Sequence, residues 1–410
     1  MRPRFALLVA LLLVGATATP AAGWATTTTA SGPAPRIAEI SNTTNHLAIP
    51  GDQVRAAEYN DSGIDVGAAV AVGSRDLHQQ HEAAAFTTEF RRLESEAQRR
   101  QLLRSTLSAI ETREAELDRS QQRALERYAA GETTASDLLR TRALVDTEAR
   151  ALSGYLSAIE RTVRIAPDYS MTDGMGTRLD NVQGNVRVLY GPVGDRLAST
   201  LGGADEPDVA YVEASETGYT VAVIDDGQYV RETRLGDERA PSLPDEFAAA
   251  AEGDPGTSRL DVADERASTL YDWLYDRQRP SFFTYGTSGI YRLSADYPGG
   301  RLTAYLDGGT TNVFYELQHH DLATVRTTTG DPVVNDGLRV VVQRSYQTGP
   351  MRVTVSDNGT GQAVDARVAV DGRQVGRTGS DGALWIVEPR GPATVNVTSG
   401  GADVSVPIDA

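Results

Sequence analysis

Residues 138–163, LLRTRALVDTEARALSGYLSAIERTV, carry a regular seven-residue pattern of apolar side chains. The pattern comprises Leu138, Val145, Leu152 and Ile159, with Arg142, Ala149, Leu156 and Val163 at the companion positions. Because seven residues make about two turns of an α-helix, this spacing places both sets along one side of a helix. It predicts a long helix that packs lengthwise against other helices.

A second helical pattern lies just upstream. Apolar residues there recur at steps of three and four, at Leu103, Leu107, Ile110, Leu117, Ala124 and Tyr128. Gly131 interrupts the pattern, and residues 132–137 offer several helix N-caps. We therefore predict an antiparallel, coiled-coil-like helical hairpin in an N-terminal domain of residues 37–166. The alternative is that both helices are core helices of a larger domain.

Residues 167–326 change to the alternating pattern of strands. Pro167 ends the hairpin, and short helical stretches follow around residues 178–188 and 195–201. We expect strands around residues 209–211, 219–224, 229–233, 289–296 and 301–307, and helices around 245–251 and 262–277. This order predicts a middle α+β domain with an antiparallel sheet.

The C-terminal part reads as all strand. Residues 327–336, TTTGDPVVND, are rich in polar residues, Gly and Pro, and we expect a linker there. Seven short strands follow at residues 338–342, 351–355, 366–370, 374–377, 384–387, 394–398 and 404–408. Their turn-punctuated spacing predicts a β-sandwich domain at residues 337–410. The whole chain is thus predicted to have a multidomain α+β fold.

Two resemblances follow from these patterns. GQAVDA at 361–366, VAVDG at 368–372, GRT at 376–378, DG at 381–382 and Pro389 resemble the carboxypeptidase-regulatory-like, transthyretin-like β-sandwich. The similarity covers roughly residues 350–408. That family is non-catalytic, so the resemblance implies a folding aid, a spacer or an adhesive unit.

The chain as a whole is similar to secreted haloarchaeal proteins of unknown function, described as secreted glycoproteins. The residues that carry this similarity are NTTNHLAIP at 42–50, RYAAG at 127–131, GPVGDR at 191–196 and YLDGGTTNVF at 305–314. The resemblance implies no activity, and no functional residue can be transferred from it.

The N-terminus has the order of a secretory signal. Arg2 and Arg4 precede the apolar run FALLVALLLV at 5–14, and small residues follow. We predict a signal peptide at residues 1–25, a disordered Thr/Pro-rich spacer at 26–36, and an extracellular or cell-surface location. No later run of apolar residues is long enough to form a transmembrane anchor. The absence of cysteine excludes disulfides and thiolate chemistry.

The charge balance indicates a habitat. The chain has 56 acidic and 39 basic residues, all 39 of them arginine, and a formal net charge of −17. Such a surface repels nucleic acid phosphates, so nucleic acid is not expected as a partner. Excess carboxylate with arginine in place of lysine is typical of extremely salt-loving archaea.

Several residues are candidates for modification or binding. Sequons predict N-glycosylation of an exported chain at Asn42, Asn60, Asn358 and Asn396. An aromatic cluster predicts a binding surface made by Tyr271, Tyr275, Phe282, Phe283 and Tyr285. The alternative for this cluster is that the rings fill the core of the middle domain, as we expect for Trp273 and Tyr291.

Catalytic and metal-binding patterns are weak. His78 with His81, and Glu316 with His320, have spacings that suit two metal ligands on a helix, but a solvated or structural role is favoured for both pairs. We therefore predict no catalytic residue, no metal and no cofactor.

These features favour a non-enzymatic, glycosylated cell-surface protein of a halophilic archaeon that acts in interaction or envelope assembly. We expect a protein partner at the envelope. The helical hairpin also offers a surface for a homo-oligomer, and the sequence leaves open whether the helices dimerise or stand alone. The alternative is a secreted hydrolase or carbohydrate-binding protein with its site in the middle domain, at acids such as Asp296 or Asp307.

Overall fold

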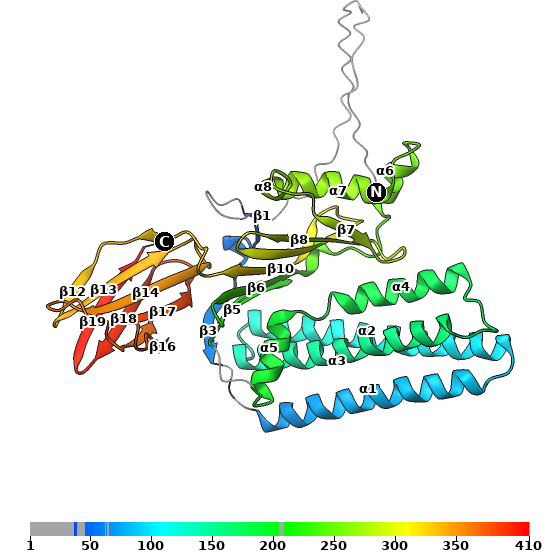
Figure 1. Cartoon of the computed structure of the whole chain (residues 1–410), viewed down its shortest axis with the longest axis horizontal. Helices are drawn as coiled ribbons and strands as arrows, with labels where there is room; N and C mark the ends of the chain where they lie inside the picture. The colour runs from blue at the N-terminus through cyan, green and yellow to red at the C-terminus, as the bar shows by residue number, and fades with distance from the viewer. Residues whose placement is uncertain (1–36, 39–45, 62, 64, 205–208, 410) are drawn as a thin grey trace, which may run out of the picture. The chain divides into compact units, whose positions relative to one another are not determined.

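The computed structural model describes residues 37–38, 46–61, 63, 65–204 and 209–409 (Figure 1). The predicted signal peptide and spacer lie outside these residues. The described chain has an α+β fold, with helices in its N-terminal part and antiparallel sheets in its middle and C-terminal parts. This confirms the predicted fold class at that level.

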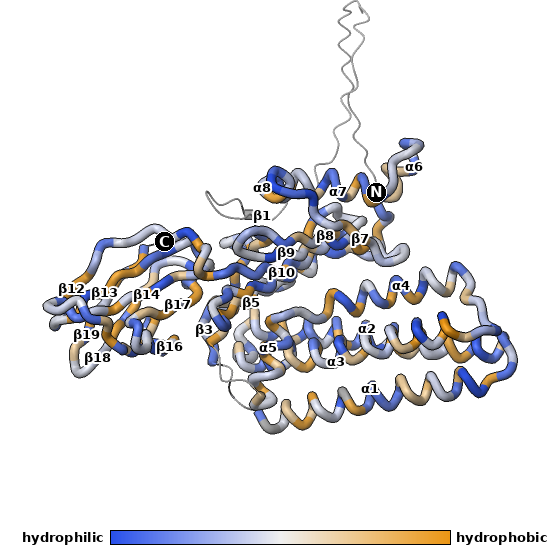
Figure 2. Tube along the Cα trace, viewed as in Figure 1, coloured by the Kyte–Doolittle hydropathy of each residue, from blue (hydrophilic) through white to orange (hydrophobic). Residues whose placement is uncertain are grey.

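The N-terminal helices pack around α3. Their bounds are Val66–Arg92 for α1, Glu96–Ala129 for α2, Ala135–Arg164 for α3, Asp173–Arg187 for α4 and Pro192–Leu201 for α5. A capping box starts α3, because Thr134 and Asp137 each accept a hydrogen bond from the other's backbone N–H. Contacts with α1, α2, α4 and α5 surround α3 and bury both of its seven-residue sets. Figure 2 shows hydrophobic and hydrophilic segments alternating along these helices.

In the described part of the chain, one antiparallel sheet has eight strands in the order β3-β4-β5-β6-β10-β9-β8-β7. The strands are Ala56–Asp61 (β3), Val209–Ala214 (β4), Gly218–Asp225 (β5), Gln228–Leu235 (β6), Ser281–Thr284 (β7), Ile290–Tyr297 (β8), Gly300–Asp307 (β9) and Val313–Asp321 (β10). The 3-10 helix η2 (Gly236–Glu238) and helices α6 (Glu246–Glu252), α7 (Arg259–Leu270) and α8 (Asp272–Tyr275) connect β6 to β7. Upstream lie β1 (Ile37–Ala38), which pairs with β2 (His46–Leu47), and the 3-10 helix η1 (Gly51–Gln53).

Both faces of this sheet are covered. Val212 and Val221 point toward the N-terminal helices, where they join a core cluster with residues of α1, α2, α3 and α5. On the opposite face, Leu293 packs with α6, α7 and α8, whereas Tyr211 and Ala222 pack with the C-terminal domain. Strands covered on both sides need apolar residues on both sides, so their sequences alternate less than those of a half-exposed sheet.

Strand β10 was not predicted from the sequence, although it lies at the centre of the sheet between β6 and β9. Its sequence, VFYELQHHD, places Glu316, Gln318 and His320 on one face, and all three are buried. Polar side chains at core positions hide the alternation by which a strand is recognised. Strand β3 was also missed, because its residues lie in the segment that we assigned to the helical domain. In the structure this strand pairs with β4.

A buried ion pair joins α3 to the sheet. Arg142 of α3 donates from Nε and Nη2 to Oε1 of Glu232 on β6, at 2.8 and 2.6 Å. Its Nη1 donates to the carbonyl of Leu189 at 3.0 Å, and Tyr219 donates to the same Glu232 oxygen at 3.0 Å. Both charged side chains are at most 3% exposed. From the sequence we placed Arg142 in the second seven-residue set along one side of the helix. In the structure it neutralises a buried carboxylate.

The GPVGDR segment fits against this pair. Gly191 N–H donates to Oδ1 of Asp146 at 2.7 Å, one turn along α3 from Arg142. A Cβ atom at Gly191 would lie 2.5 Å from Oε2 of Glu232, and one at Gly194 would lie 2.7 Å from Cβ of Asp146. Real Cβ atoms do not approach other atoms so closely. Glycine is therefore needed at both positions for α5 to reach α3 and β6.

The C-terminal domain is a sandwich of two antiparallel sheets, as predicted. Within residues 328–408, one sheet has the order β11-β13-β14-β17 with β12 paired to β13, and the other has the order β16-β15-β18-β19. The strands are Thr328–Thr329 (β11), Val333–Asn335 (β12), Leu338–Arg344 (β13), Pro350–Asp357 (β14), Arg367–Val370 (β15), Arg373–Arg377 (β16), Ala383–Val387 (β17), Ala393–Ser399 (β18) and Ala402–Ile408 (β19). The segment expected as a linker, 327–336, contains β11 and β12 and so belongs to the first sheet.

Polar contacts tie the sandwich to the eight-stranded sheet. Arg390 donates to both carboxylate oxygens of Glu213 on β4, at 2.7 and 2.8 Å. Tyr59 of β3 donates to the carbonyl of Val387 at 2.5 Å, and Tyr229 of β6 donates to that of Thr348 at 2.8 Å. A bidentate arginine–carboxylate pair and buried tyrosines fix orientation as well as distance.

The ion pair in the core generates a stability prediction. Replacing Arg142 by Met leaves the buried Glu232 carboxylate without its counter-ion, and we expect a loss of about 3–5 kcal/mol in the free energy of unfolding. Arg140→Met is the matched control, because Arg140 lies on the same helix with a 44% exposed side chain paired to Asp65. We expect at most about 1 kcal/mol for the control. Denaturant unfolding at one fixed salt concentration measures both, and equal losses would contradict the assignment.

Candidate interaction surface

Helix α1 lies along α3 but contributes little to the core. Asp65 caps its start by accepting a hydrogen bond from Ala68 N–H at 2.9 Å. Ala68, Phe86 and Phe90 are its buried residues among the side chains that the structure describes, so no described side chain from 69 to 85 is buried. The buried side chains therefore lie near the two ends of the helix, and its middle is partly exposed.

The outer face of α1 forms an uncharged stripe. It consists of Gly67, Val70, Ser74, Leu77, His81, Ala84 and Thr88, which follow one another at alternating steps of three and four and are all exposed. Val70 is 67% exposed and Leu77 is 69% exposed. No carboxylate or arginine belongs to the stripe, although charged residues make up 23% of the chain. We call this set the α1 stripe.

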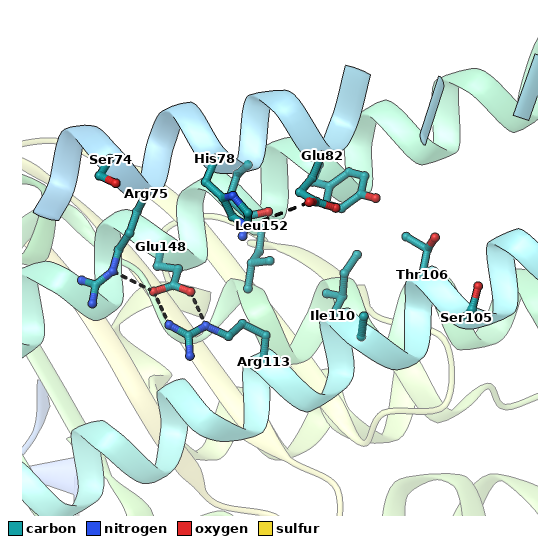
Figure 3. A pocket seen from close by; sticks show the side chains of 13 residues that line it. Ser74, Arg75, His78, Glu82, Ser105, Thr106, Ile110, Arg113, Glu148 and Leu152 are labelled. Atoms are coloured by element: carbon teal, nitrogen blue, oxygen red, sulfur yellow. Dashed lines mark hydrogen bonds and ion pairs between the residues drawn. The ribbon is translucent and has the colours of Figure 1, made fainter. Parts of the chain in front are cut away.

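Grooves run along both flanks of α1. The first, of about 630 Å³, lies between α1, α2 and α3, and Figure 3 shows the side chains that line it. There Glu148 of α3 accepts from Nη2 of Arg113 on α2 at 2.8 Å, and its Oε2 lies 3.2 Å from Nε of Arg75 on α1. A second bond to the same carboxylate comes from Nε of Arg113. One buried glutamate thus links three helices.

This triad is suited to holding helices and not to moving protons. The hydrogen bond to Glu148 raises the pKa of Arg113 further above its ordinary value, so the guanidinium stays charged. Nη1 of Arg75 is buried without a hydrogen-bond partner, so the hydrogen-bonding capacity of this α1 side chain is only partly used. His78 is the other basic side chain of the groove; it lies 3.9 Å from Glu82, and both are largely exposed.

The second groove, of about 650 Å³, lies between α1, α3 and α5. Small residues line much of it, among them Ala83 of α1, Ala151 and Gly154 of α3, and Ala198 of α5. Small side chains leave space that another side chain can fill. The α1 stripe is therefore bordered on this flank by an open, mostly apolar groove.

The triad makes the attachment of α1 testable. Glu148→Gln removes the charge that holds Arg75 and Arg113, and we expect backbone amides in the first half of α1 to exchange about 10–100 times faster. Glu116→Gln is the control, because Glu116 is 47% exposed and pairs with Arg113 on the same helix. Hydrogen exchange by mass spectrometry measures both variants. Unchanged exchange of α1 in Glu148→Gln would show that the triad does not hold this helix.

The predicted aromatic surface does not exist as one surface. Tyr271 is fully buried and donates to Glu316, and Tyr285 is 9% exposed. Tyr275 and Phe282 are partly buried and pack against the core around α7. Phe283, at 49% exposure, is the member that faces solvent to a large extent. The alternative interpretation, that these rings fill the core, describes most of the cluster.

The four predicted glycosylation sites differ in their environment. Asn42 lies outside the described residues. Asn60 is 6% exposed, and its Oδ1 accepts from Ser136, so its amide is not presented to an enzyme. Asn396 is partly exposed on β18, and its Nδ2 donates to Ser405 at 2.8 Å. Asn358 is exposed in the turn after β14 and is the described sequon most accessible for modification.

The acidic and histidine residues of β10 serve the core. Because the segment is a strand, Glu316 and His320 do not have the helical spacing considered for a metal site. Glu316 accepts from Tyr271 Oη at 2.5 Å and from Leu47 N–H at 3.0 Å, and His320 Nδ1 lies 3.1 Å from Tyr297 Oη. Among the described residues, no group of three or more His, Asp or Glu side chains is placed to share a metal ion.

These two buried groups predict opposite pH dependences. Burial raises the pKa of Glu316 to about 7 from 4.5, so the folded state holds a proton that the unfolded chain releases, and its contribution to stability falls as pH rises from 4.5 to 7. Burial lowers the pKa of His320 to about 4 from 6.5, so its contribution rises between pH 4 and 6.5.

Glu316→Gln should remove the decrease in stability that the Glu316 carboxyl causes as pH rises from 4.5 to 7. Relative to the unsubstituted protein, we expect this variant to gain about 3 kcal/mol of unfolding free energy between pH 4.5 and 7. Denaturant unfolding across this range measures the difference. His320→Gln is the control, because it removes the increase in stability that His320 causes between pH 4 and 6.5 and should therefore change the pH dependence in the opposite direction. A pH-independent difference for Glu316→Gln would contradict the raised pKa.

Acids considered for a hydrolase do not share a cleft. Asp307 is fully buried and accepts from Ala240 N–H at 3.2 Å and from two N–H groups of its own turn, beside Arg239. Asp296 has a 74% exposed side chain that pairs with Arg301. Sequence reasoning missed Glu114, whose pKa is raised to about 7 by burial and by Asp118. Asp118 in turn pairs with Arg234 at 2.6 Å.

The fold defines a class of protein: an α+β domain with an N-terminal group of helices, followed by a β-sandwich. Residues 1–206 match the family model described as Domain of unknown function (DUF7096), and residues 210–326 match Family of unknown function (DUF7094). Because the first model covers half of the chain, the chain belongs to the DUF7096 family. No curated protein and no solved structure matches the chain.

Residues 329–406 match the Archaeal fibronectin-III type-like domain. The β-sandwich expected from the sequence is therefore confirmed, whereas the matching family is the fibronectin type and not the carboxypeptidase-regulatory-like type. In the described part of the chain, no helix is both long and apolar enough to cross a membrane.

Proposed function

We propose that this chain is an exported, glycosylated, non-enzymatic protein of the cell surface of a halophilic archaeon, and that it acts by binding protein in the envelope. The observation that carries the proposal is the α1 stripe, which exposes Val70 and Leu77 on a helix flanked by open grooves. Exposed apolar side chains gathered on one helix face are a feature of protein contact sites. The homo-oligomer expected through the helical hairpin is one form of this binding.

Sequence features support the cellular setting. The apolar run at 5–14 after two arginines has the form of an export signal. A net charge of −17 without any lysine suits a protein surrounded by concentrated salt, which screens the repulsion between carboxylates. Asn358 is the proposed glycan carrier, because it is exposed and its sequon lies in a turn.

The sandwich supports an interaction role in a different way. Its core is continuous with side chains of the eight-stranded sheet, and Arg390 fixes it to Glu213. A β-sandwich attached in this way can serve as a spacer. The alternative of a secreted hydrolase or carbohydrate-binding protein is favoured less, because the expected acids lie apart and Asp118 is already paired.

The experiment is cross-linking on intact cells at their growth salt. The chain has no cysteine, so Leu77→Cys introduces a single thiol in the α1 stripe, and Leu243→Cys is the control at a 55% exposed position outside it. We expect a maleimide–benzophenone reagent, attached to the thiol and then irradiated so that it inserts into C–H bonds of its neighbour, to link position 77, and not position 243, to protein of the envelope. Mass analysis of the recovered chain should show a glycan at Asn358 and none at Asn60. A chain free in the medium with no adduct at position 77 would refute the proposal.

A further inference from the structure

We propose that two copies of this chain pair through α1, with the helices antiparallel and a two-fold axis beside Leu77. This inference rests on the proposed interaction role and names the partner as a second copy. A two-fold contact uses the same surface on both copies, so the surface must be complementary to itself. The α1 stripe meets this condition in spacing, charge and side-chain size.

The spacing of the α1 stripe is that of a helix–helix contact. Val70, Leu77 and Ala84 follow one another at steps of seven, and Gly67, Ser74, His81 and Thr88 form the second set. Positions repeated in this way stay on one side of a helix over its whole length. From residue 67 to residue 88 the stripe extends about 32 Å, long enough for six turns of one helix to lie on another.

The net charge of the chain favours the α1 stripe as the face through which two copies meet. Two copies that each carry a charge of −17 repel each other wherever carboxylates would meet. The α1 stripe contains no Asp, Glu or Arg, so two stripes meet without opposing charges of the same sign. A partner selected by charge would instead require a charged face.

Charge and size at the ends of the stripe select the antiparallel sense. With the axis at Leu77, the exposed Arg91 and Arg92 of the two copies lie at opposite ends of the contact, and the two helix dipoles oppose each other. The same arrangement sets Val70 against Ala84, a larger side chain against a smaller one. A parallel pair would bring both arginine ends together.

The grooves provide room for such a contact. The groove lined by Ala83, Ala151, Gly154 and Ala198 runs along one flank of α1, so no other helix crowds the α1 stripe on that side. A contact of one helix and one groove per copy is small, so we expect a dissociation constant on the order of micromolar.

The test uses purified, full-length mature protein at high salt. Leu77→Cys places two thiols near the proposed axis, and we expect a disulfide-linked dimer under mild oxidation. Thr88→Cys is the control on the same helix, because in an antiparallel pair the two thiols lie far apart, whereas in a parallel pair they meet. Leu243→Cys is the control outside α1. A dimer from Thr88→Cys together with one from Leu77→Cys would overturn the antiparallel pairing.

Sedimentation equilibrium supplies the non-covalent readout. We expect the unsubstituted protein to form dimers as its concentration rises from about 1 to 200 µM, and Leu77→Glu to weaken dimerisation at least about tenfold by burying a charge. Leu243→Glu should leave dimerisation unchanged, and circular dichroism should be the same for all variants. Dimerisation unaffected by Leu77→Glu would overturn the proposal.

The two proposals fail in different ways. If the purified chain stays a monomer at the highest concentration while position 77 cross-links to another envelope protein in cells, pairing with a second copy is refuted and the interaction role stands. If position 77 captures neither a second copy nor another envelope protein, both the pairing and the interaction role are refuted.

Discussion

The buried pair between Arg142 and Glu232 is the constraint on which the arrangement of helices and sheet depends. A carboxylate on a strand covered on both faces is stable only if a counter-ion and hydrogen-bond donors reach it, and these come from α3, Tyr219 and the backbone near Leu189. The approach needed for this contact also explains why Gly191 and Gly194 carry no side chain. The pair links α3 to β6 beside the apolar cluster that α3 shares with the sheet, and the other N-terminal helices contact α3.

The same helix gives α1 its exposed position. On its inner side α3 meets the sheet, and on its outer side Glu148 holds Arg75 and Arg113. Because α1 is attached mainly at its ends and through this triad, its middle turns present Val70 and Leu77 to solvent. In an otherwise highly charged chain, that exposure is the feature that points to interaction. The sandwich contacts the eight-stranded sheet through Arg390 and three tyrosines.

Much of the fold was predictable from local patterns. The long helices, the hairpin turns of the middle sheet and all seven strands predicted for the sandwich have regular periodicity or Asp-Gly turns, which depend on neighbours in sequence. Strands β3 and β10 were not predictable in this way. Glu316 and His320 are acceptable in β10 because Tyr271, Leu47 and Tyr297 satisfy them, and these partners come from distant segments. The aromatic cluster failed as a surface for the same reason, since folding placed Tyr271 and Tyr285 inside the protein.

By itself, the sequence determined the fold class, the β-sandwich and the charge of the surface, because periodicity and composition are properties of neighbouring residues. The α1 stripe was also readable in principle, since Val70, Leu77 and Ala84 stand at seven-residue steps in a stretch of few charges. Only the tertiary structure decided that this stripe faces outward while the comparable stripes of α2 and α3 are buried. Each helix has a face that needs a partner, and the number of partners available around α3 determines which face is left exposed.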